Sequence, residues 1–307
     1  MPAPRKSTAS SRRRPSRTSA RLSKPSGRYP RSVVTLGIIL ALIVIAAVAL
    51  LIVTAGKSNS KSDITHELPE GAMPTAQQLM DVKNPDGLRQ KLLHYTAMDI
   101  SFNRDTHQPN WVAWELLGSE VSTDVSRESG FSPDPEVDGC AVTEDYRHTG
   151  FDRGHMAPAG DMKWDKDAMR ESFYMTNICP QSPDLNRGAW KKLEEKCRVR
   201  AQADSSLIIV CGPIFDKSGP SARLGGTGVA VPSKFFKVIL APYVPKPWAI
   251  GFVMPNGYVQ GGMQKAAVPV DSVESLTGYD FFHYLPDDIE TVVEARCDFN
   301  SFSRVRR

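Results

Sequence analysis

The stretch that decides how this chain is interpreted runs from residue 152 to residue 194 and reads DRGHMAPAGDMKWDKDAMRESFYMTNICPQSPDLNRGAWKKLE. Three motifs follow one another in it: DRGH at Asp152–His155, TNICPQ at Thr176–Gln181 and LNRGAWKKLE at Leu185–Glu194. Between residues 186 and 201, apolar residues recur at intervals of three and four, which predicts a helix. Residues 128–150 are rich in Gly, Pro, Asp and Ser and predict a long irregular loop, a type of segment that is often functional.

His155 and Asn186 are the residues in this stretch that can carry chemistry. A neutral imidazole can take a proton from water near neutral pH, because the pKa of histidine is about 6.5. The amide oxygen of Asn186 is a hard, neutral ligand suited to Mg²⁺. Glu194 follows Asn186 by two turns on one side of the helix, near enough to hold water bound to such an ion. Taken alone, these residues also fit a core histidine, a helix N-cap and a solvated helix charge.

Arg127 and Arg153 add positive charge to the same region. Phosphodiester cleavage builds negative charge at phosphorus, and guanidinium groups and metal ions are the usual counter-charges. Taken singly, each arginine also fits an ordinary surface salt bridge. The order and spacing of the three motifs therefore carry the prediction, and no single residue does.

With these motifs in this order, residues 85–307 resemble the DNA/RNA non-specific endonuclease family, whose members share the ββα-metal, or His-Me finger, site. The family pattern is D-R-G-H followed by A-P, then T-N-I-x-P-Q, then L-N-x-G-x-W-x-x-L-E, and this chain matches all three parts. The resemblance implies an α+β fold with a mixed central β-sheet flanked by helices. It also implies a hydrolase that cuts phosphodiester bonds in DNA and RNA with little sequence preference.

The resemblance implies a role for each matching residue. His155 is expected to be the general base, with Arg153 helping to hold the phosphate. Asn186 is expected to be the single direct protein ligand of Mg²⁺, with Mn²⁺ as the alternative ion. Glu194 would orient the waters around that ion, and Asn177 would position His155 or the phosphate.

The upstream loop supplies one more expected residue. Arg127 begins the pattern Arg-x-x-x-Phe-x-x-Asp at Arg127–Asp134 and resembles the family's transition-state arginine. In the implied reaction, water activated by His155 attacks phosphorus and the 3′ oxygen leaves, so the products carry 5′-phosphates. Homodimers are frequent in the family, which makes a homodimer a further expectation.

Apolar and aromatic runs predict the remainder of the domain. The predicted strands are 92–102, 111–117, 173–178, 207–211, 228–231, 235–240 and 248–253. Two helices are predicted at 270–276 and 287–295. Because strands and helices do not alternate, the order is typical of a strand-rich α+β domain and not of a βαβ fold.

The N-terminal part of the chain predicts a membrane anchor. Residues 1–32 contain ten Lys or Arg and no acid, which indicates a disordered basic tail. Residues 33–55 carry no charge and, at about 1.5 Å per residue, are long enough to cross a hydrocarbon core of about 30 Å as a transmembrane helix. Residues 56–84 are then a linker and residues 85–307 the endonuclease domain.

Charge asymmetry predicts the orientation of this anchor. The positive-inside rule keeps the tail in the cytoplasm and places the nuclease domain outside it. The alternative is an anchor in the mitochondrial inner membrane, with the domain facing the intermembrane space.

Overall charge and cysteine spacing narrow the classes of function. Without the tail, 28 basic residues stand against 34 acidic ones, a net charge of −6, so any nucleic-acid site must be a local basic patch. The five cysteines show no CxxC pair, which excludes a zinc-finger site; their pairing stays open.

Two other functions fit parts of this pattern. The first is a membrane-tethered, non-catalytic nucleic-acid-binding protein, for example in DNA uptake. It is disfavoured because a pure binder has no use for a metal-ligating asparagine beside a histidine. The second is a phosphodiesterase that acts on small nucleotides.

Overall fold

The computed structural model describes residues 73–304. The expected basic tail (1–32), the expected transmembrane segment (33–55) and most of the expected linker lie outside the described residues. Among the described residues, no helix combines the length and apolar character needed to cross a membrane.

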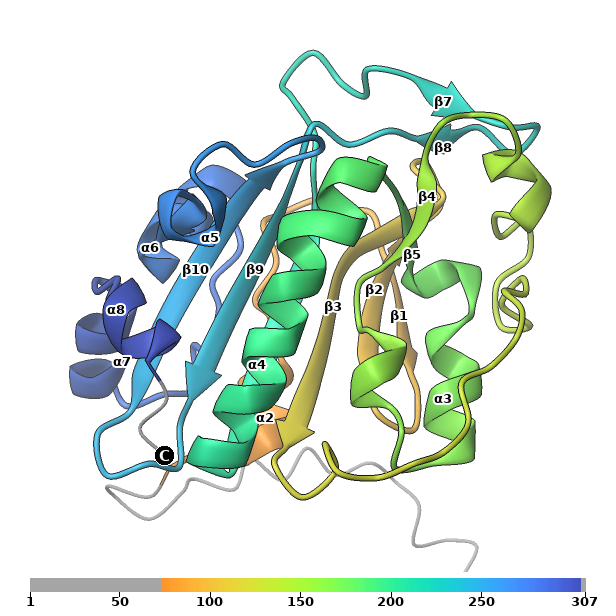
Figure 1. Ribbon diagram of the computed structural model, residues 1–307. Helices are drawn as coiled ribbons and strands as arrows, with labels where there is room; N and C mark the ends of the chain where they lie inside the picture. Colours follow the sequence, from red (N-terminus) through yellow and green to blue (C-terminus); the bar gives the residue numbers. More distant parts are fainter. Residues whose placement is uncertain (1–72, 305–307) are drawn as a thin grey trace, which may run out of the picture. The chain divides into compact units, whose positions relative to one another are not determined.

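A seven-stranded sheet forms the centre of the domain (Figure 1). Its strand order is β1-β2-β3-β6-β9-β10-β11, and every neighbouring pair is antiparallel. The strands are β1 (Lys91–His94), β2 (Asp99–Asn103), β3 (Gln108–Leu117), β6 (Ser206–Ile214), β9 (Lys234–Ala241), β10 (Trp248–Pro255) and β11 (Ala267–Val268). The α+β class is therefore confirmed, but the sheet is antiparallel and not mixed.

The central strands are covered on both faces, which explains their almost unbroken apolar sequence. Every residue of β6 is buried, and its side chains alternate between two cores because successive strand residues point to opposite faces. Leu207 and Ile209 join one core, whereas Ile208 and Val210 join the other. These two sides are called here the α4 face and the α6 face, after the helices that pack on them.

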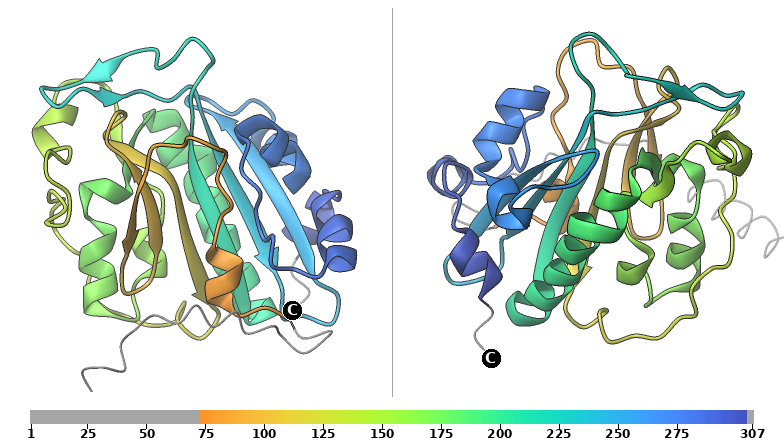
Figure 2. Two further views of the ribbon diagram at one scale, coloured as in Figure 1. Left: turned by 180° about the vertical axis from the view of Figure 1, so that it is seen from behind. Right: turned by 45° about the horizontal axis from the view of Figure 1, so that its top comes forward.

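Helices cover each face in turn. Helix α4 (Lys191–Asp204) runs along one face in Figure 1 and buries Leu193, Cys197 and Ala201. On the other face lie α6 (Val270–Thr277), α7 (Asp287–Glu294) and α2 (Ala76–Met80), the last seen from behind in Figure 2. The remaining helices are α3 (Lys166–Ser172), α5 (Gly262–Ala266) and α8 (Phe299–Ser303).

Ordered packing begins before the expected domain boundary at residue 85. Thr75 caps α2 by accepting a hydrogen bond from the Gln78 backbone N–H, and Leu79 and Val82 are buried in the α6 face. Lys83 pairs with Asp280 through backbone and side-chain contacts. The domain therefore includes residues before 85, because Leu79, Met80 and Val82 belong to its core.

Two of the predicted strands differ from the structure. The predicted strand 92–102 is a hairpin of β1 and β2, which turns at Tyr95–Met98. The predicted strand 173–178 is wrong: Met175–Asn177 form a 3-10 turn, and the strand β5 (Ile178–Gln181) begins only after it. The turn is buried, so its apolar pattern resembles that of a strand.

A second, two-stranded sheet stands beside α4. It pairs β4 (Asp152–His155) with β5 in antiparallel register, so that His155 faces Ile178 and Asp152 faces Gln181. Another short pair joins β7 (Arg223–Leu224) and β8 (Val229–Ala230) at one end of the domain (Figure 1). All five cysteines are free thiols, and only Cys297 is exposed.

Candidate active site

The three sequence motifs fold into one strand–strand–helix unit. DRGH forms β4, the end of TNICPQ forms β5, and the third motif begins with a widened turn at Leu185–Trp190 that continues into α4. Gly188 interrupts this turn with φ −103° and ψ −110°. The segments therefore meet although the chain separates them by up to 40 residues.

Gly154 has no side chain, which allows β4 and β5 to pack closely at this position. A Cβ at Gly154 would stand 2.2 Å from Oε1 of Gln181, whose buried amide fills the space. Because this atom lies in a packed interior, a larger residue at 154 would displace it. The glycine of DRGH is thus required by packing next to His155.

His155 lies between two aromatic rings at the end of β4. Its ring centroid is 5.1 Å from that of Phe131 and 4.9 Å from that of Phe173. Its Nε2 is buried and has no hydrogen-bond partner among the described residues. Burial, with a smaller effect of the Arg127 guanidinium, lowers the pKa of His155 to about 3. The imidazole is therefore neutral at physiological pH.

Both predicted arginines reach His155 through the same aromatic rings. The Arg127 guanidinium lies over Phe173, with Cζ 4.9 Å from the ring centroid, and that of Arg153 lies over Phe131 at 4.8 Å. Cation–π contacts of this kind hold a guanidinium in place while its N–H groups stay free to bind an anion. The expected basic patch is therefore local and surrounds His155.

Asn186 is tied to the strand that carries His155. Its Nδ2 donates a hydrogen bond to Oδ2 of Asp152 at 2.9 Å, and Arg187 Nε donates to the same oxygen at 2.8 Å. A carboxylate can only accept, so Asp152 fixes which end of the Asn186 amide it faces. The amide oxygen is thereby left for another partner, and a hard oxygen donor suits Mg²⁺ or Mn²⁺.

Asn177 lies behind the site and not in it. The side chain is fully buried. Its Oδ1 accepts from the Ala157 backbone N–H at 2.9 Å, and its Nδ2 donates to the carbonyls of Ala157 and Ser172, each at 2.8 Å. These bonds occupy the amide and leave nothing for a phosphate. Asn177 was predicted to position either His155 or the phosphate. Its hydrogen bonds to Ala157, two residues after His155, favour the first role.

Glu194 lies on α4, two turns after Asn186, and is half-buried. Burial raises the pKa of Glu194 to about 7; Lys237 is the largest opposing influence, Asp161 raises the pKa and Arg198 lowers it. Its described neighbours are thus a group of buried charges. The structure shows no direct contact, among residues 73–304, between this side chain and His155 or Asn186.

Some residues that shape the site received no role from the sequence. Asp152 orients Asn186, and Phe131 and Phe173 enclose His155. Asp152 stands in the DRGH motif, three residues before the histidine, so its position was a usable signal. Phe131 stands in the Arg-x-x-x-Phe-x-x-Asp pattern at Arg127–Asp134, whereas Phe173 lies outside the quoted motifs, and the two rings meet only in three dimensions.

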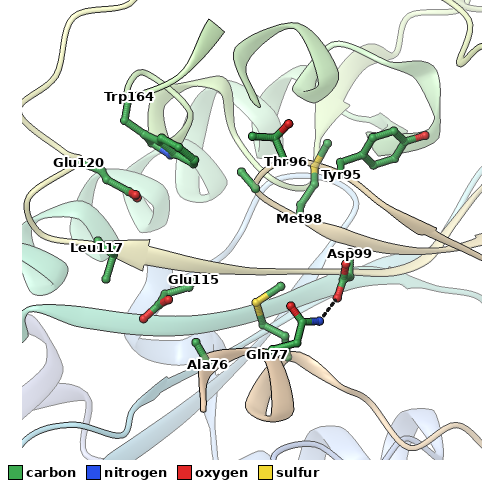
Figure 3. A pocket seen from close by; sticks show the side chains of 12 residues that line it. Ala76, Gln77, Tyr95, Thr96, Met98, Asp99, Glu115, Leu117, Glu120 and Trp164 are labelled. Carbon is green, nitrogen blue, oxygen red and sulfur yellow. Dashed lines mark hydrogen bonds between the residues drawn. The ribbon is translucent and has the colours of Figure 1, made fainter. Parts of the chain in front are cut away.

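A pocket of about 330 Å³ elsewhere in the domain is unsuited to a phosphate (Figure 3). Asp99, Glu115 and Glu120 line it, with Gln77 hydrogen-bonded to Asp99 at 2.8 Å. None of the predicted site residues lines it. Three carboxyl groups would repel a polyanion, so the basic surroundings of His155 remain the candidate site.

Two antiparallel strands are followed by a helix, with a histidine on the first strand and an asparagine where the helix begins, which is the arrangement expected from the resemblance to ββα-metal nucleases. Residues 75–288 match the family model described as "DNA/RNA non-specific endonuclease". The chain belongs to this family.

Several known proteins are similar to the chain. The mitochondrial nuclease EXOG of Mus musculus is 36% identical over 205 residues, which cover 61% of this chain and 56% of that protein. The aligned region thus spans little more than half of this relative. A nuclease of Nostoc sp. is 32% identical over 243 residues, covering 75% of this chain and 84% of that protein. Among solved structures, a chain in the crystal structure of the EndoG/EndoGI complex matches with a TM-score of 0.62 and 29% identity, covering 70% of this chain and 94% of that one.

Proposed function

We propose that this chain is a divalent-metal-dependent, sugar-non-specific endonuclease that hydrolyses DNA and RNA. The observation that carries the proposal is that Asn186 is hydrogen-bonded to Asp152, on the same short strand as His155. Asp152 holds the Asn186 amide from one end of β4, and His155 stands at the other end of the same four-residue strand. The candidate metal ligand is therefore tied by a hydrogen bond to the strand that carries the general base.

His155 is the general base in this proposal. The ring is neutral at physiological pH, and its buried Nε2 has no partner among the described residues. A water at this nitrogen would lose its proton to the ring as it attacks phosphorus, while the P–O3′ bond breaks and the leaving 3′ oxygen takes up a proton from a second water. Because water attacks, the 2′-hydroxyl is not needed and the products carry 5′-phosphates.

Arg127 and Arg153 bind the phosphate and stabilise the charge that develops on it. Their guanidinium groups are held by Phe173 and Phe131 on either side of the histidine. A cation on the Asn186 oxygen would supply further positive charge at the scissile phosphate. Glu194 would orient the water around that cation.

A nicking assay tests this proposal directly. The full-length protein is incubated with supercoiled plasmid and with single-stranded RNA, with Mg²⁺, with Mn²⁺ and with EDTA. We expect cleavage of both substrates with either metal ion and none with EDTA. Asn186→Ala should lose the activity, whereas Asn300→Ala, an exposed asparagine on α8, should keep it.

The same assay distinguishes the two other functions. Binding of DNA without cleavage at any metal concentration would indicate a non-catalytic receptor. Cleavage of bis-nitrophenyl phosphate but not of plasmid or RNA would indicate a phosphodiesterase for small nucleotides.

The location and the assembly state are part of the proposal. We propose that residues 33–55 anchor the chain in a membrane, on the evidence of their uncharged sequence alone. The names of relatives from Mus musculus and Danio rerio include "mitochondrial", which favours the mitochondrial inner membrane over the first expectation of a cytoplasmic tail with the nuclease domain outside the cytoplasm. The homodimer stays a prediction.

A further inference from the structure

A buried carboxyl group without a partner stands at the end of α7. Glu294 is only 5% exposed, and its Oε1 has no hydrogen-bond partner among residues 73–304. Within the same residues, no ion pair involves this side chain. An ionised carboxylate in such a place is strongly unfavourable unless a positive charge compensates it. The last turn of a helix adds to that cost, because it carries the negative end of the helix dipole.

Two acids of α6 face this carboxyl group. Asp271 and Glu274 lie one turn apart on one side of α6. Helices α6 and α7 contact each other, and both pack against β10 (Figure 1). One side-chain oxygen of each of Asp271, Glu274 and Glu294 lies within 4.8 Å of those of the other two. Three carboxyl groups from two helices therefore converge on one point.

The separation of these oxygens suits a hard divalent cation of the size of Ca²⁺. Ca²⁺ binds oxygen ligands at about 2.3–2.6 Å in a flexible geometry, so two of its ligands can stand up to about 5 Å apart. Mg²⁺ binds at about 2.0–2.1 Å, demands near-octahedral geometry and usually keeps several waters. Asp271 is exposed and Glu274 is half-buried, so the point where the oxygens meet is open to solvent on the α6 side.

We propose that Asp271, Glu274 and Glu294 form a calcium-binding site between α6 and α7. Glu294 supplies the buried ligand, and the two acids of α6 supply ligands nearer the surface. Glu274 is already held in place, because its Oε1 accepts a hydrogen bond from the Phe281 backbone N–H at 2.8 Å. The ion would join the two helices and offset the buried charge of Glu294.

Protons compete with the cation for the same oxygens. Burial, with a further effect of Glu274, raises the pKa of Glu294 to about 9, and burial raises that of Glu274 to about 7. A bound cation must displace these protons, so calcium binding should strengthen as the pH rises. The other titratable groups nearby are Glu290, His283 and Asp280, the last paired with Lys83 at 2.9 Å.

A calcium titration of the full-length protein tests the site. Every protein in the test carries Asn186→Ala, so that a cation at the nuclease centre adds nothing to the result. At pH 8 we expect Ca²⁺ to bind with a Kd of about 0.1–1 mM, as in calcium sites of extracellular modules. At ten times that Kd, the thermal midpoint should rise by about 3–6 °C relative to EDTA. At pH 5 the rise should be almost absent.

Single substitutions assign the response to these carboxyl groups. Glu294→Gln and Asp271→Asn should each weaken calcium binding by more than about 10-fold, since even loss of a group that only supports a metal ligand commonly costs about 10–100-fold. Asp271→Asn changes an exposed side chain, so the core stays intact in that variant. Asp288→Asn, at an exposed acid on α7, is the matched control and should keep the full response.

Three outcomes would overturn the inference. The first is a thermal midpoint that Ca²⁺ leaves unchanged at pH 8. The second is a calcium response that survives both Glu294→Gln and Asp271→Asn. The third is an equal response to Mg²⁺, which would contradict the assignment to calcium. None of these measurements involves nucleic acid, so their result is independent of the proposed nuclease function.

Discussion

The two faces of the central sheet surround their buried acids with different neighbours. On the α4 face, Asp161 and Glu194 stand among two cations, Arg198 and Lys237. On the α6 face, Asp271, Glu274 and Glu294 bring one ligand atom each within 4.8 Å of one another. Glu294 is 5% exposed, and its Oε1 has no partner among the described residues.

The difference shows how charge is used on each face. Burial, together with the neighbouring carboxyl groups, raises the pKa of Glu274 to about 7 and that of Glu294 to about 9. Burial also raises the pKa of Asp161 and of Glu194, the latter to about 7, but cations oppose that rise on the α4 face, whereas carboxyl groups add to it on the α6 face. We infer that charge on the α4 face supports chemistry, whereas the α6 face, without a bound cation, tolerates its acids at a cost in stability. Substitutions on the first face should then change the cleavage rate, and those on the second should change only stability.

The largest effect is expected at His155. His155→Asn removes the proton acceptor with little change in volume, so the cleavage rate should fall by about 10²–10⁴-fold. The ring packs between Phe131 and Phe173, so the thermal midpoint is measured with the rate to separate loss of the base from loss of stability. The matched substitution His148→Asn, at an exposed position with φ 60° that asparagine tolerates, should leave the rate unchanged. Near-normal cleavage by His155→Asn would mean that another group is the base.

A smaller effect on rate is expected at Asp152. Asp152→Asn keeps the shape of the side chain but presents a neutral amide to Asn186 and Arg187. The Asn186 amide is then free to turn its oxygen away from the site, and the rate should fall by about 10–100-fold. The loss should shrink at high Mg²⁺, as measured by initial rates over a metal titration. A loss that does not depend on the metal concentration would argue that Asp152 acts only through Arg187.

Much of this site was predictable because its motifs are local. The order of the DRGH, TNICPQ and LNRGAWKKLE motifs placed the residues of the ββα unit, and the helical spacing after residue 186 predicted α4. The split of the predicted strand 92–102 into a hairpin was not visible, since Tyr95–Met98 lack the usual Gly, Pro or Asn of a turn. The 3-10 turn before β5 was hidden by its burial.

The parts that could not be predicted depend on tertiary contacts. Lys237 stands in a strongly apolar strand, FFKVIL, where a lysine would ordinarily mark an exposed position. Only the packing of β9 against α4 shows that it contacts Trp190. The enclosure of His155 by Phe131 and Phe173 likewise depends on three separate segments that meet in the fold.

The smallest effect is expected on the α6 face, in stability alone. In the unfolded chain Glu294 loses its proton near pH 4.5, whereas in the folded protein it keeps the proton up to about pH 9. Its contribution to stability is therefore fully present below pH 4.5 and is lost as the pH rises toward 9. Glutamine at position 294 stays neutral over this pH range. The stability of Glu294→Gln relative to the native protein should therefore increase as the pH rises from 4.5 to 9. At pH 8 we expect a gain of about 1–2 kcal/mol, smaller than the pKa shift alone would give because the amide is buried too.

Thermal unfolding in EDTA at pH 5 and pH 8 measures this gain. For a domain of this size about 1 kcal/mol raises the midpoint by about 2–4 °C, so the variant should gain a few degrees at pH 8 and almost nothing at pH 5. Glu195→Gln, an exposed acid on α4 at 3.9 Å from Lys191, should shift the midpoint little at either pH. Cleavage by Glu294→Gln should be unchanged, because its side chain lies on the face away from His155. A variant that loses stability at pH 8 would show that Glu294 is ionised and compensated there, and the contrast between the two faces would then be wrong.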